Sequence, residues 1–222
     1  MPQLEIAGPA GRLECLLDEP SPAGTVGADG LLTPTRPATV RAAAVLGHPH
    51  TEYGGTMHTK AVYQSAKALS RIGCAVLRFN FRGAGASAGS FAEGVGERED
   101  FRAALEYMHE RYPGAKLWTA GMSFGSYVAL TVGADDPRVS TLVGIAPPLS
   151  RYDFEPVARS TKAKFFVQGE RDELCPLTEM RQFYARCAEP KELVVIDGAD
   201  HLFDGKVSEV ADAIEDLLGD WP

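Results

Sequence analysis

The chain has 222 residues, of which 45% are hydrophobic, and it carries a formal net charge of −8 with a pI near 5.2. A chain of this size can bury a substantial core, and we expect one domain over residues 1–222. The acidic balance argues against nucleic acid and anionic membranes as partners. No secretory signal or membrane-spanning stretch is visible, and four scattered cysteines fit a reduced protein, so we expect a cytoplasmic location.

The first forty or so positions differ in character from the rest of the chain. Residues 3–7 and 11–17 place apolar side chains on either side of Gly8-Pro9-Ala10-Gly11, which predicts a β-hairpin. Residues 18–39 are rich in Pro, Gly, Ser and Thr, and they predict an irregular surface loop that is too short for a domain linker.

Beyond this loop, short apolar runs alternate with segments of helical spacing. The predicted strands cover 40–46, 74–81, 116–120, 139–146, 164–168 and 192–196, and the predicted helices cover 57–72, 97–112, 124–134, 177–187 and 206–218. This alternation predicts an α/β fold with a mostly parallel twisted sheet and helices on both faces. Binding sites of such sheets gather outside the carboxyl ends of the strands, so the loops there are the place to look for chemistry.

One of these loops holds Gly121-Met122-Ser123-Phe124-Gly125, which lies between a predicted strand and a predicted helix. A G-x-S-x-G sequence in this context is typical of a nucleophile elbow, in which a sharp turn projects the serine hydroxyl from the sheet. Gly121 and Gly125 would relieve crowding across such a turn. The helix that follows would direct free N–H groups toward developing negative charge. The alternative is an ordinary strand-to-helix turn.

A serine hydroxyl needs a base, and two further strand ends supply the residue types. Asp172 follows the strand at 164–168, and His201 follows the strand at 192–196. A histidine can take the serine proton while a carboxylate on its other ring nitrogen fixes the tautomer. Three other carboxylates could play the acid role in place of Asp172, although loop carboxylates more often form turns or caps: Asp153, Asp197 and Asp200.

Five segments in this order resemble the α/β-hydrolases, and in particular their small, lidless, dienelactone-hydrolase-like branch. The segments are Gly47-His48-Pro49-His50 with Gly54-Gly55, Phe79-Asn80-Phe81-Arg82-Gly83, Gly121-Met122-Ser123-Phe124-Gly125, Gln168-Gly169-Glu170-Arg171-Asp172, and Gly198-Ala199-Asp200-His201. The resemblance implies an α/β-hydrolase fold with an N-terminal antiparallel hairpin and no lid domain. It also implies that Ser123 is the nucleophile, Asp172 the acid and His201 the base.

The same resemblance implies an oxyanion hole of two backbone N–H groups, one from Phe124 and one from the loop after the first predicted parallel strand. Pro49 has no N–H, so His50 is the expected second donor, with Thr51 as the alternative. The sequence departs here from the more usual His-Gly loop. His48 and His50 could also seed a metal site, but no downstream histidine cluster completes one, and we expect neither metal nor cofactor.

Two features bear on the substrate. Tyr53 and Met122 are expected to contact it, because both lie in or beside the loops at the predicted site. Fewer than twenty residues separate the strands at 139–146 and 164–168, which leaves no room for a lid domain. We therefore expect an open, shallow site for a small or soluble acyl substrate.

The sequence thus predicts a serine hydrolase that cleaves a carboxylic ester, thioester or lactone of a small molecule through an acyl-enzyme. The bond type follows from analogy at the level of the fold. Three alternatives stay open: a non-catalytic α/β-hydrolase-like protein, an acyltransferase that uses the same triad, and a metal-dependent hydrolase built on His48 and His50. The sequence does not determine the oligomeric state.

Overall fold

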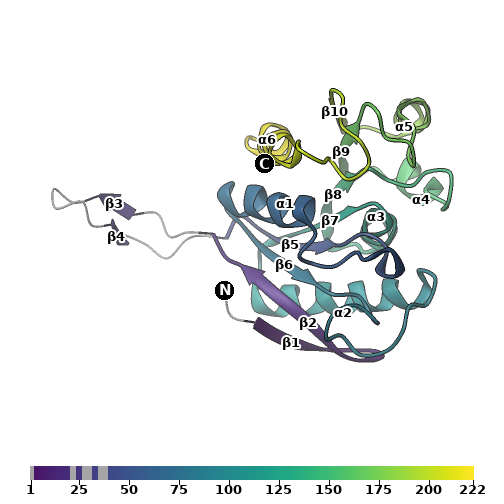
Figure 1. The fold of residues 1–222 in the computed structure, drawn as a ribbon. Helices are drawn as coiled ribbons and strands as arrows, with labels where there is room; N and C mark the ends of the chain where they lie inside the picture. Colours follow the sequence, from purple (N-terminus) through teal and green to yellow (C-terminus); the bar gives the residue numbers. More distant parts are fainter. Residues whose placement is uncertain (1–2, 21–23, 27–31, 35–39) are drawn as a thin grey trace.

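The computed structural model describes residues 3–20, 24–26, 32–34 and 40–222, which form an α/β architecture (Figure 1). The strands are β1 (Gln3–Gly8), β2 (Gly11–Asp18), β3 (Gly24–Val26), β4 (Leu32–Pro34), β5 (Ala42–Gly47), β6 (Cys74–Phe79), β7 (Lys116–Met122), β8 (Val139–Ile145), β9 (Ala163–Gly169) and β10 (Lys191–Ile196). The helices are α1 (Lys60–Arg71), α2 (Val95–Arg111), α3 (Phe124–Asp135), α4 (Glu155–Arg159), α5 (Leu177–Arg186) and α6 (Val207–Leu218), with a 3₁₀ turn η1 (Thr51–Tyr53).

The main sheet has eight strands in the order β1-β2-β6-β5-β7-β8-β9-β10. The hairpin strands β1 and β2 pair antiparallel with each other, and β2 pairs antiparallel with β6. All pairs from β6 to β10 are parallel. These findings confirm the predicted α/β-hydrolase fold, in which a mostly parallel sheet carries an N-terminal antiparallel hairpin.

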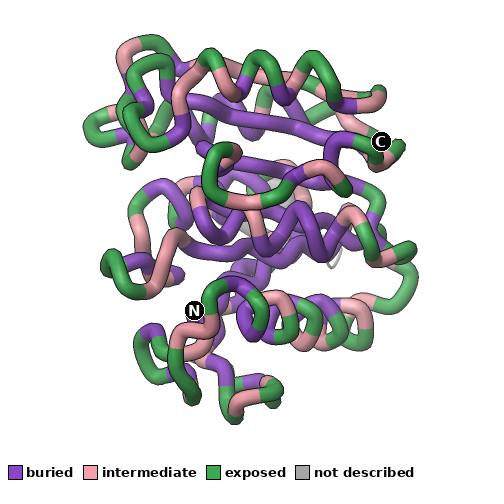
Figure 2. Tube along the Cα trace, turned by 90° about the vertical axis from the view of Figure 1, so that its right-hand side faces the viewer, coloured by how far each residue is buried: buried purple, intermediate pink, exposed green. Residues whose placement is uncertain are grey.

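Helices cover both faces of the sheet, and two apolar clusters fill the space beneath them. One cluster joins α1 and α6 to the sheet, and the other joins α2, α3, α4 and α5 to the opposite face. Side chains of a strand alternate between the faces. In β7, Leu117 belongs to the α2–α5 side, whereas Trp118, Ala120 and Met122 belong to the α1–α6 side. The buried strands lie between helices whose outer sides are exposed (Figure 2).

The structure corrects the expectation of an irregular segment at 18–39. Among its described residues, β3 and β4 form a two-stranded antiparallel sheet with Thr25 opposite Thr33. Thr and Val favour extended backbone, and three residues a strand suffice for one short ladder, which a composition count does not detect. The sequence prediction also missed α4 and η1. Both are too short to show a helical period.

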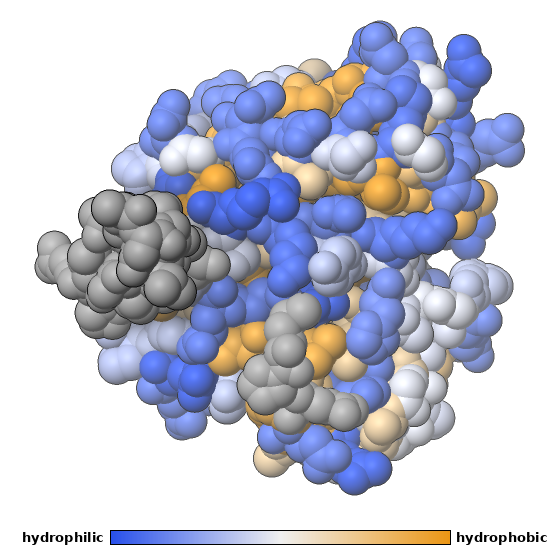
Figure 3. All heavy atoms as spheres, turned by 60° about the vertical axis from the view of Figure 1, so that its left-hand side comes forward, coloured by the Kyte–Doolittle hydropathy of each residue, from blue (hydrophilic) through white to orange (hydrophobic). Residues whose placement is uncertain are grey.

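The loops after β5, β7, β9 and β10 meet at the carboxyl edge of the parallel strands, as the topology requires. The connection from β8 to β9 contains only the five-residue α4, so the fold has no lid domain. Among the described residues, no helix is long and apolar enough to cross a membrane. One face of the molecule is mainly hydrophilic, with smaller hydrophobic areas between its polar side chains (Figure 3).

Candidate active site

Ser123 lies between β7 and α3 with backbone angles φ 52° and ψ −123°. A positive φ is unfavourable for a residue with a side chain and costs on the order of 1–3 kcal/mol. Backbone and side-chain hydrogen bonds hold this turn. The N–H of Ser123 donates to the carbonyl of Ile145 (2.8 Å), and its carbonyl accepts from the N–H (2.8 Å) and the hydroxyl (2.6 Å) of Ser126. The strained turn is therefore fixed on both sides of the serine.

The two glycines of the G-x-S-x-G sequence allow this turn to form. A Cβ atom on Gly121 would lie 2.2 Å from the carbonyl oxygen of Gly125, and a Cβ on Gly125 would lie 2.4 Å from that of Gly47. Both distances are far below any tolerated contact with backbone. Glycine at 121 therefore lets the turn close, and glycine at 125 lets the start of α3 pack closely against the end of β5.

The structure places Ser123, His201 and Asp172 in one chain of hydrogen bonds. Nε2 of His201 lies 2.9 Å from Oγ of Ser123, and Nδ1 lies 2.9 Å from Oδ2 of Asp172. An ionised carboxylate can only accept, so Nδ1 carries the proton and Nε2 is left to accept from the serine hydroxyl. The three side chains come from the loops after β7, β9 and β10.

Asp172 is buried, and its carboxylate accepts four hydrogen bonds. Oδ1 accepts from the N–H groups of Leu174 (2.9 Å) and Cys175 (2.7 Å), and Oδ2 accepts from Nε2 of Gln168 (3.0 Å) as well as from His201. These bonds satisfy the oxygens of the buried carboxylate and fix its orientation toward the histidine ring. The sequence prediction did not assign a role to Gln168.

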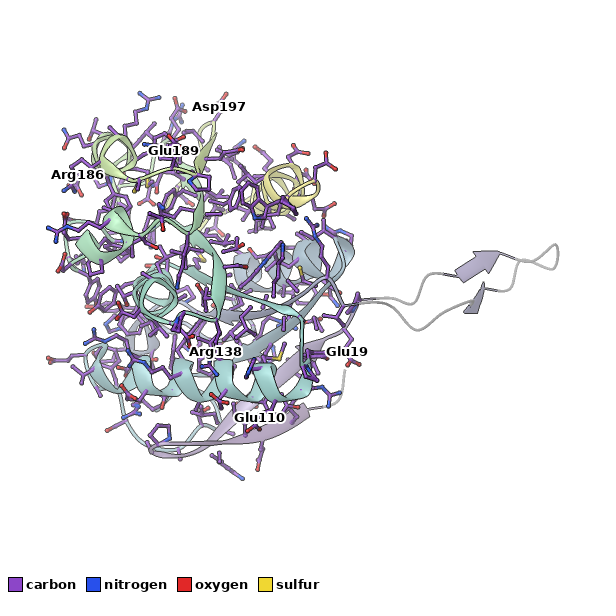
Figure 4. All side chains as sticks on the ribbon, turned by 180° about the vertical axis from the view of Figure 1, so that it is seen from behind. Glu19, Glu110, Arg138, Arg186, Glu189 and Asp197 are labelled. Carbon is purple, nitrogen blue, oxygen red and sulfur yellow. The ribbon has the colours of Figure 1, made fainter. Side chains whose placement is uncertain are left out.

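The other three carboxylates do not reach the histidine ring. Oδ1 of Asp153 accepts the N–H at the start of α4 (2.8 Å). Oδ1 of Asp200 accepts two N–H groups of the turn that follows it (3.1 and 3.0 Å). Asp197 is exposed and projects outward beyond β10 (Figure 4). Asp153 and Asp200 thus accept hydrogen bonds from nearby backbone N–H groups, as loop carboxylates commonly do.

His48 fixes the loop after β5 through hydrogen bonds of its two ring nitrogens. Its ring is buried, and its Nε2 accepts the N–H of Phe81 (3.0 Å), so Nδ1 carries the proton and donates to the carbonyl of Pro49 (2.6 Å). Burial lowers the pKa of His48 to about 4, so the ring is neutral near pH 7. The carbonyl and N–H of a trans peptide point in opposite directions. Fixing the Pro49 carbonyl therefore directs the N–H of His50 away from the His48 ring.

The backbone N–H groups predicted for the oxyanion hole are available. Among the described residues, no acceptor takes a hydrogen bond from the N–H of Phe124, His50 or Thr51. The N–H of Gly55 donates to the carbonyl of His50 (3.0 Å), which closes the loop on itself. Assignment of Phe124 and His50 as the oxyanion donors stays a prediction, and Thr51 remains the alternative.

Two groups of side chains bear on metal binding. Both ring nitrogens of His48 are engaged by backbone, so that ring has no free ligand atom. Ligand atoms of Asp172, Cys175 and His201 lie within 4.8 Å of one another. However, the Asp172 carboxylate and the His201 ring already bind each other, and burial raises the pKa of the Cys175 thiol, which donates to the carbonyl of Ala146 (3.4 Å). This donor set suits proton transfer better than metal ligation, because a protonated thiol is a weak ligand.

A cavity of about 800 Å³ opens beside Ser123. Tyr53 lines it, as the sequence prediction requires of a substrate contact, and is 79% exposed. Met122 does not line it. Because side chains alternate along β7, the Met122 side chain lies buried in the α1–α6 cluster, and this corrects the prediction that it contacts substrate. The lining residues are Pro49, His50, Tyr53, Ser123, Phe124, Pro148, Arg151, Tyr152, Arg171, Glu173, Leu174, Cys175, Gly198, Asp200, His201 and Leu202.

The sequence prediction missed several of these lining residues, among them Arg151, Tyr152, Arg171, Leu174 and Leu202. All five lie in loops that follow β8, β9 or β10. Their position after parallel strands was a usable signal, since such loops surround the site. The residue types alone gave no signal that these five residues line the cavity.

Comparison with known proteins identifies the family of the chain. Residues 40–166 match the family described as serine aminopeptidase, S33. A solved α/β serine hydrolase homologue from Coxiella burnetii is 33% identical with a TM-score of 0.86, covering 98% of this chain and 97% of that one. A lidless α/β serine hydrolase from Xanthomonas campestris is also 33% identical with a TM-score of 0.86, covering 99% and 94%. An uncharacterized protein of Rickettsia prowazekii (strain Madrid E) is 33% identical over 98% of this chain and 89% of its own length.

The chain therefore belongs to the S33 serine aminopeptidase family of α/β-hydrolases, and its fold is of the lidless kind. Its family and structural relatives support activity as a hydrolase. The resemblance to the α/β-hydrolases is confirmed, while the narrower likeness to dienelactone hydrolases stays a prediction.

Proposed function

We propose that the protein is a serine hydrolase that cleaves carboxylic esters of small or soluble substrates through an acyl-enzyme. The observation that carries this proposal is the position of His201, whose two ring nitrogens each lie 2.9 Å from a partner, Ser123 Oγ on one side and Asp172 Oδ2 on the other. This geometry matches what nucleophile activation requires.

In the proposed reaction, Oγ of Ser123 attacks the ester carbonyl carbon while Nε2 of His201 takes the hydroxyl proton. The Asp172 carboxylate stabilises the imidazolium that results. When the tetrahedral intermediate collapses, the C–O bond to the alcohol breaks and His201 returns the proton to the leaving oxygen. Water then attacks the acyl-enzyme with His201 again as base, which releases the acid and restores Ser123.

The tetrahedral oxyanion would accept hydrogen bonds from the N–H groups of Phe124 and His50. Phe124 opens α3, so the positive end of the helix dipole adds to this stabilisation. The free state of both N–H groups supports the assignment, because a donor already in use could not serve an oxyanion.

The short connection between β8 and β9 supports a small or soluble substrate, because no lid would cover a long lipid chain. Some solved structures that share the fold at lower identity are described as esterases. Thioesters and lactones react by the same steps and fall within the proposal. Acyl transfer would differ only in the nucleophile that meets the acyl-enzyme.

Activity-based labelling tests the proposal directly. A fluorophosphonate probe should label the wild-type protein and fail to label Ser123→Ala, while Ser140→Ala, at an exposed serine of β8, serves as the control. A panel of p-nitrophenyl esters of increasing chain length should then show turnover that favours short chains. Absence of labelling in the wild type would favour the non-catalytic alternative. Faster cleavage of aminoacyl nitroanilides than of esters would favour a peptidase.

A further inference from the structure

We propose that Arg151 and Arg171 form an anion-recognition site in the cavity, so that the substrate is an ester carrying a carboxylate or another negatively charged group. This inference rests on the proposed function and narrows its substrate class. Both arginines line the cavity that opens beside Ser123. Apart from the histidines, which can also be protonated, these two arginines are the lining residues with a positively charged side chain.

The two guanidinium groups lack protein partners, which sets them apart from most exposed arginines of the described chain. Figure 4 shows Arg138 and Arg186 at the surface, where Arg138 pairs with Asp136 and Glu106, and Arg186 pairs with Glu155. Ion pairs also hold Arg12, Arg71, Arg102, Arg111 and Arg159. Within the described residues, no carboxylate lies within ion-pair distance of Arg151 or Arg171. The N–H donors of both guanidinium groups are thus free to bind a ligand.

The backbone around Arg151 is anchored, so its side chain starts from a defined place. Its N–H donates to the carbonyl of Pro148 (3.0 Å), and the next residue, Tyr152, stacks on Tyr127 of α3 at 4.2 Å and 15°. Burial is the main cause that lowers the pKa of His50 and raises the pKa of Cys175, two other residues of the cavity wall, and the positive charge of Arg151 also acts on both groups, in the lowering direction. Its field therefore reaches into the cavity from the β8 side.

Arg171 approaches the same cavity from β9. It directly precedes Asp172, and its N–H donates to the carbonyl of Ala199 (2.8 Å), two residues before His201. The loops that carry the acid and the base are thus tied together at this residue. Because Arg171 lines the same cavity as Ser123 and His201, an anion held by it would lie in the cavity that contains the reacting groups.

The carboxylates of Asp200 and Glu173 also line the cavity and oppose this attraction. Asp200 uses one carboxylate oxygen on two backbone N–H groups. Glu173, two residues after Arg171, lines the cavity and is exposed. The chain as a whole carries a net charge of −8, which repels anions, so two unpaired arginines at the cavity give local selectivity against that background.

The test compares matched esters on variant enzymes at physiological ionic strength. On the acyl side, mono-p-nitrophenyl glutarate is compared with p-nitrophenyl pentanoate, in which a methyl group replaces the carboxylate. On the alcohol side, 4-carboxyphenyl pentanoate is compared with 4-methylphenyl pentanoate. The readout is the ratio of kcat/KM for the anionic ester to that for its neutral partner.

We expect this ratio to fall about threefold in Arg151→Gln or Arg171→Gln and about tenfold in the double variant, as partly exposed charge pairs allow. Glu173→Gln should raise it. Arg181→Gln, which removes an exposed arginine of α5 outside the cavity, should leave it unchanged and controls for net charge. If the kcat/KM ratio falls only for the acyl-side pair or only for the alcohol-side pair, that pair identifies the half of the substrate that carries the negative charge. A double variant with both ratios within about twofold of wild type would overturn the proposal, because even a weak ion pair contributes that much.

A binding experiment tests the anion site separately from the proposed hydrolase activity. Glutaryl 4-nitroanilide and pentanoyl 4-nitroanilide are titrated by calorimetry into Ser123→Ala with and without the two arginine substitutions. Selective loss of glutaryl binding in the arginine variant supports the anion site even if no ester is hydrolysed. Equal binding of both anilides in all variants rejects the anion site even if esters are turned over.

Discussion

The side-chain nitrogen of Gln168 lies 3.0 Å from Oδ2 of Asp172, the same carboxylate oxygen that accepts the Nδ1–H of His201. The same nitrogen also donates to the carbonyl of Cys175 at 2.7 Å. Gln168 thus joins the end of β9 to both ends of the loop that holds the acid. It acts on the reaction only through Asp172.

Replacing Gln168 with Leu should lower kcat by about tenfold and the free energy of unfolding by about 1–3 kcal/mol, the cost of unsatisfied buried acceptors. Steady-state kinetics and urea unfolding would measure the two effects. Gln168→Met, which keeps the length of the side chain and removes the donor without adding a charge, separates the hydrogen bond from packing. A Leu variant with unchanged kcat would show that the backbone N–H groups position Asp172 without help.

Asp172→Asn should lower kcat by about 10⁴-fold, because an amide can donate to Nδ1 and thereby favour the wrong histidine tautomer. Burst-phase kinetics with a p-nitrophenyl ester would locate the defect in acylation. Asp197→Asn changes an exposed carboxylate away from the cavity and is the matched control. If both variants kept near-normal turnover, the acid role would belong to another carboxylate.

The buried His48 should make folding stability depend on pH. Its pKa is lowered from 6.5 to about 4 in the folded protein by burial, so below about pH 6.5 the unfolded chain binds a proton that the folded chain does not. This contribution to stability is complete above pH 6.5 and is lost as the pH falls toward 4. At pH 5 the loss should be about 2 kcal/mol.

Urea unfolding of wild type and His48→Gln at pH 7.5 and pH 5 would measure that loss. The variant should be less stable at pH 7.5, because the bonds to Phe81 and Pro49 are weakened, yet it should show a smaller drop on acidification. His58→Gln, at an exposed histidine, is the control. An identical drop in wild type and His48→Gln would mean that other groups set the pH dependence.

Gly121→Ala should destabilise the fold by more than about 3 kcal/mol and abolish labelling of Ser123, because the new Cβ would meet backbone. A Cβ atom at position 121 would lie 2.2 Å from the Gly125 carbonyl oxygen. Gly114→Ala provides a graded comparison, since nothing lies near that position and only its positive φ of 87° opposes alanine. Thermal unfolding that ranked the two variants equally would contradict the close approach of Gly121 and Gly125 within the elbow.

Much of this arrangement could be predicted from the sequence, because the strongest signals are local. The G-x-S-x-G motif identified the turn at Ser123, and apolar runs placed most parallel strands within a few residues of their observed bounds. Chain order then predicted Asp172 and His201 as its partners, a role that stays a prediction although their geometry agrees with it.

What the sequence did not reveal depends on contacts between distant residues. The direction of the Met122 side chain follows from strand alternation relative to faces that only the assembled sheet defines. The bond from Gln168 to Asp172 depends on a loop closing over the end of β9. The place of Arg151 in the cavity requires knowing that the β8 loop turns toward the site of Ser123.

The segment between β8 and β9 offers a route to new specificity. It carries Arg151 and the short α4, yet none of Ser123, Asp172 or His201 lies within it. Evolution or a designer could lengthen it, or graft another loop there, while the strands that support the reacting side chains keep their register. A library built in this segment should therefore vary substrate preference and enantioselectivity while the reactivity of the serine toward a small probe is retained.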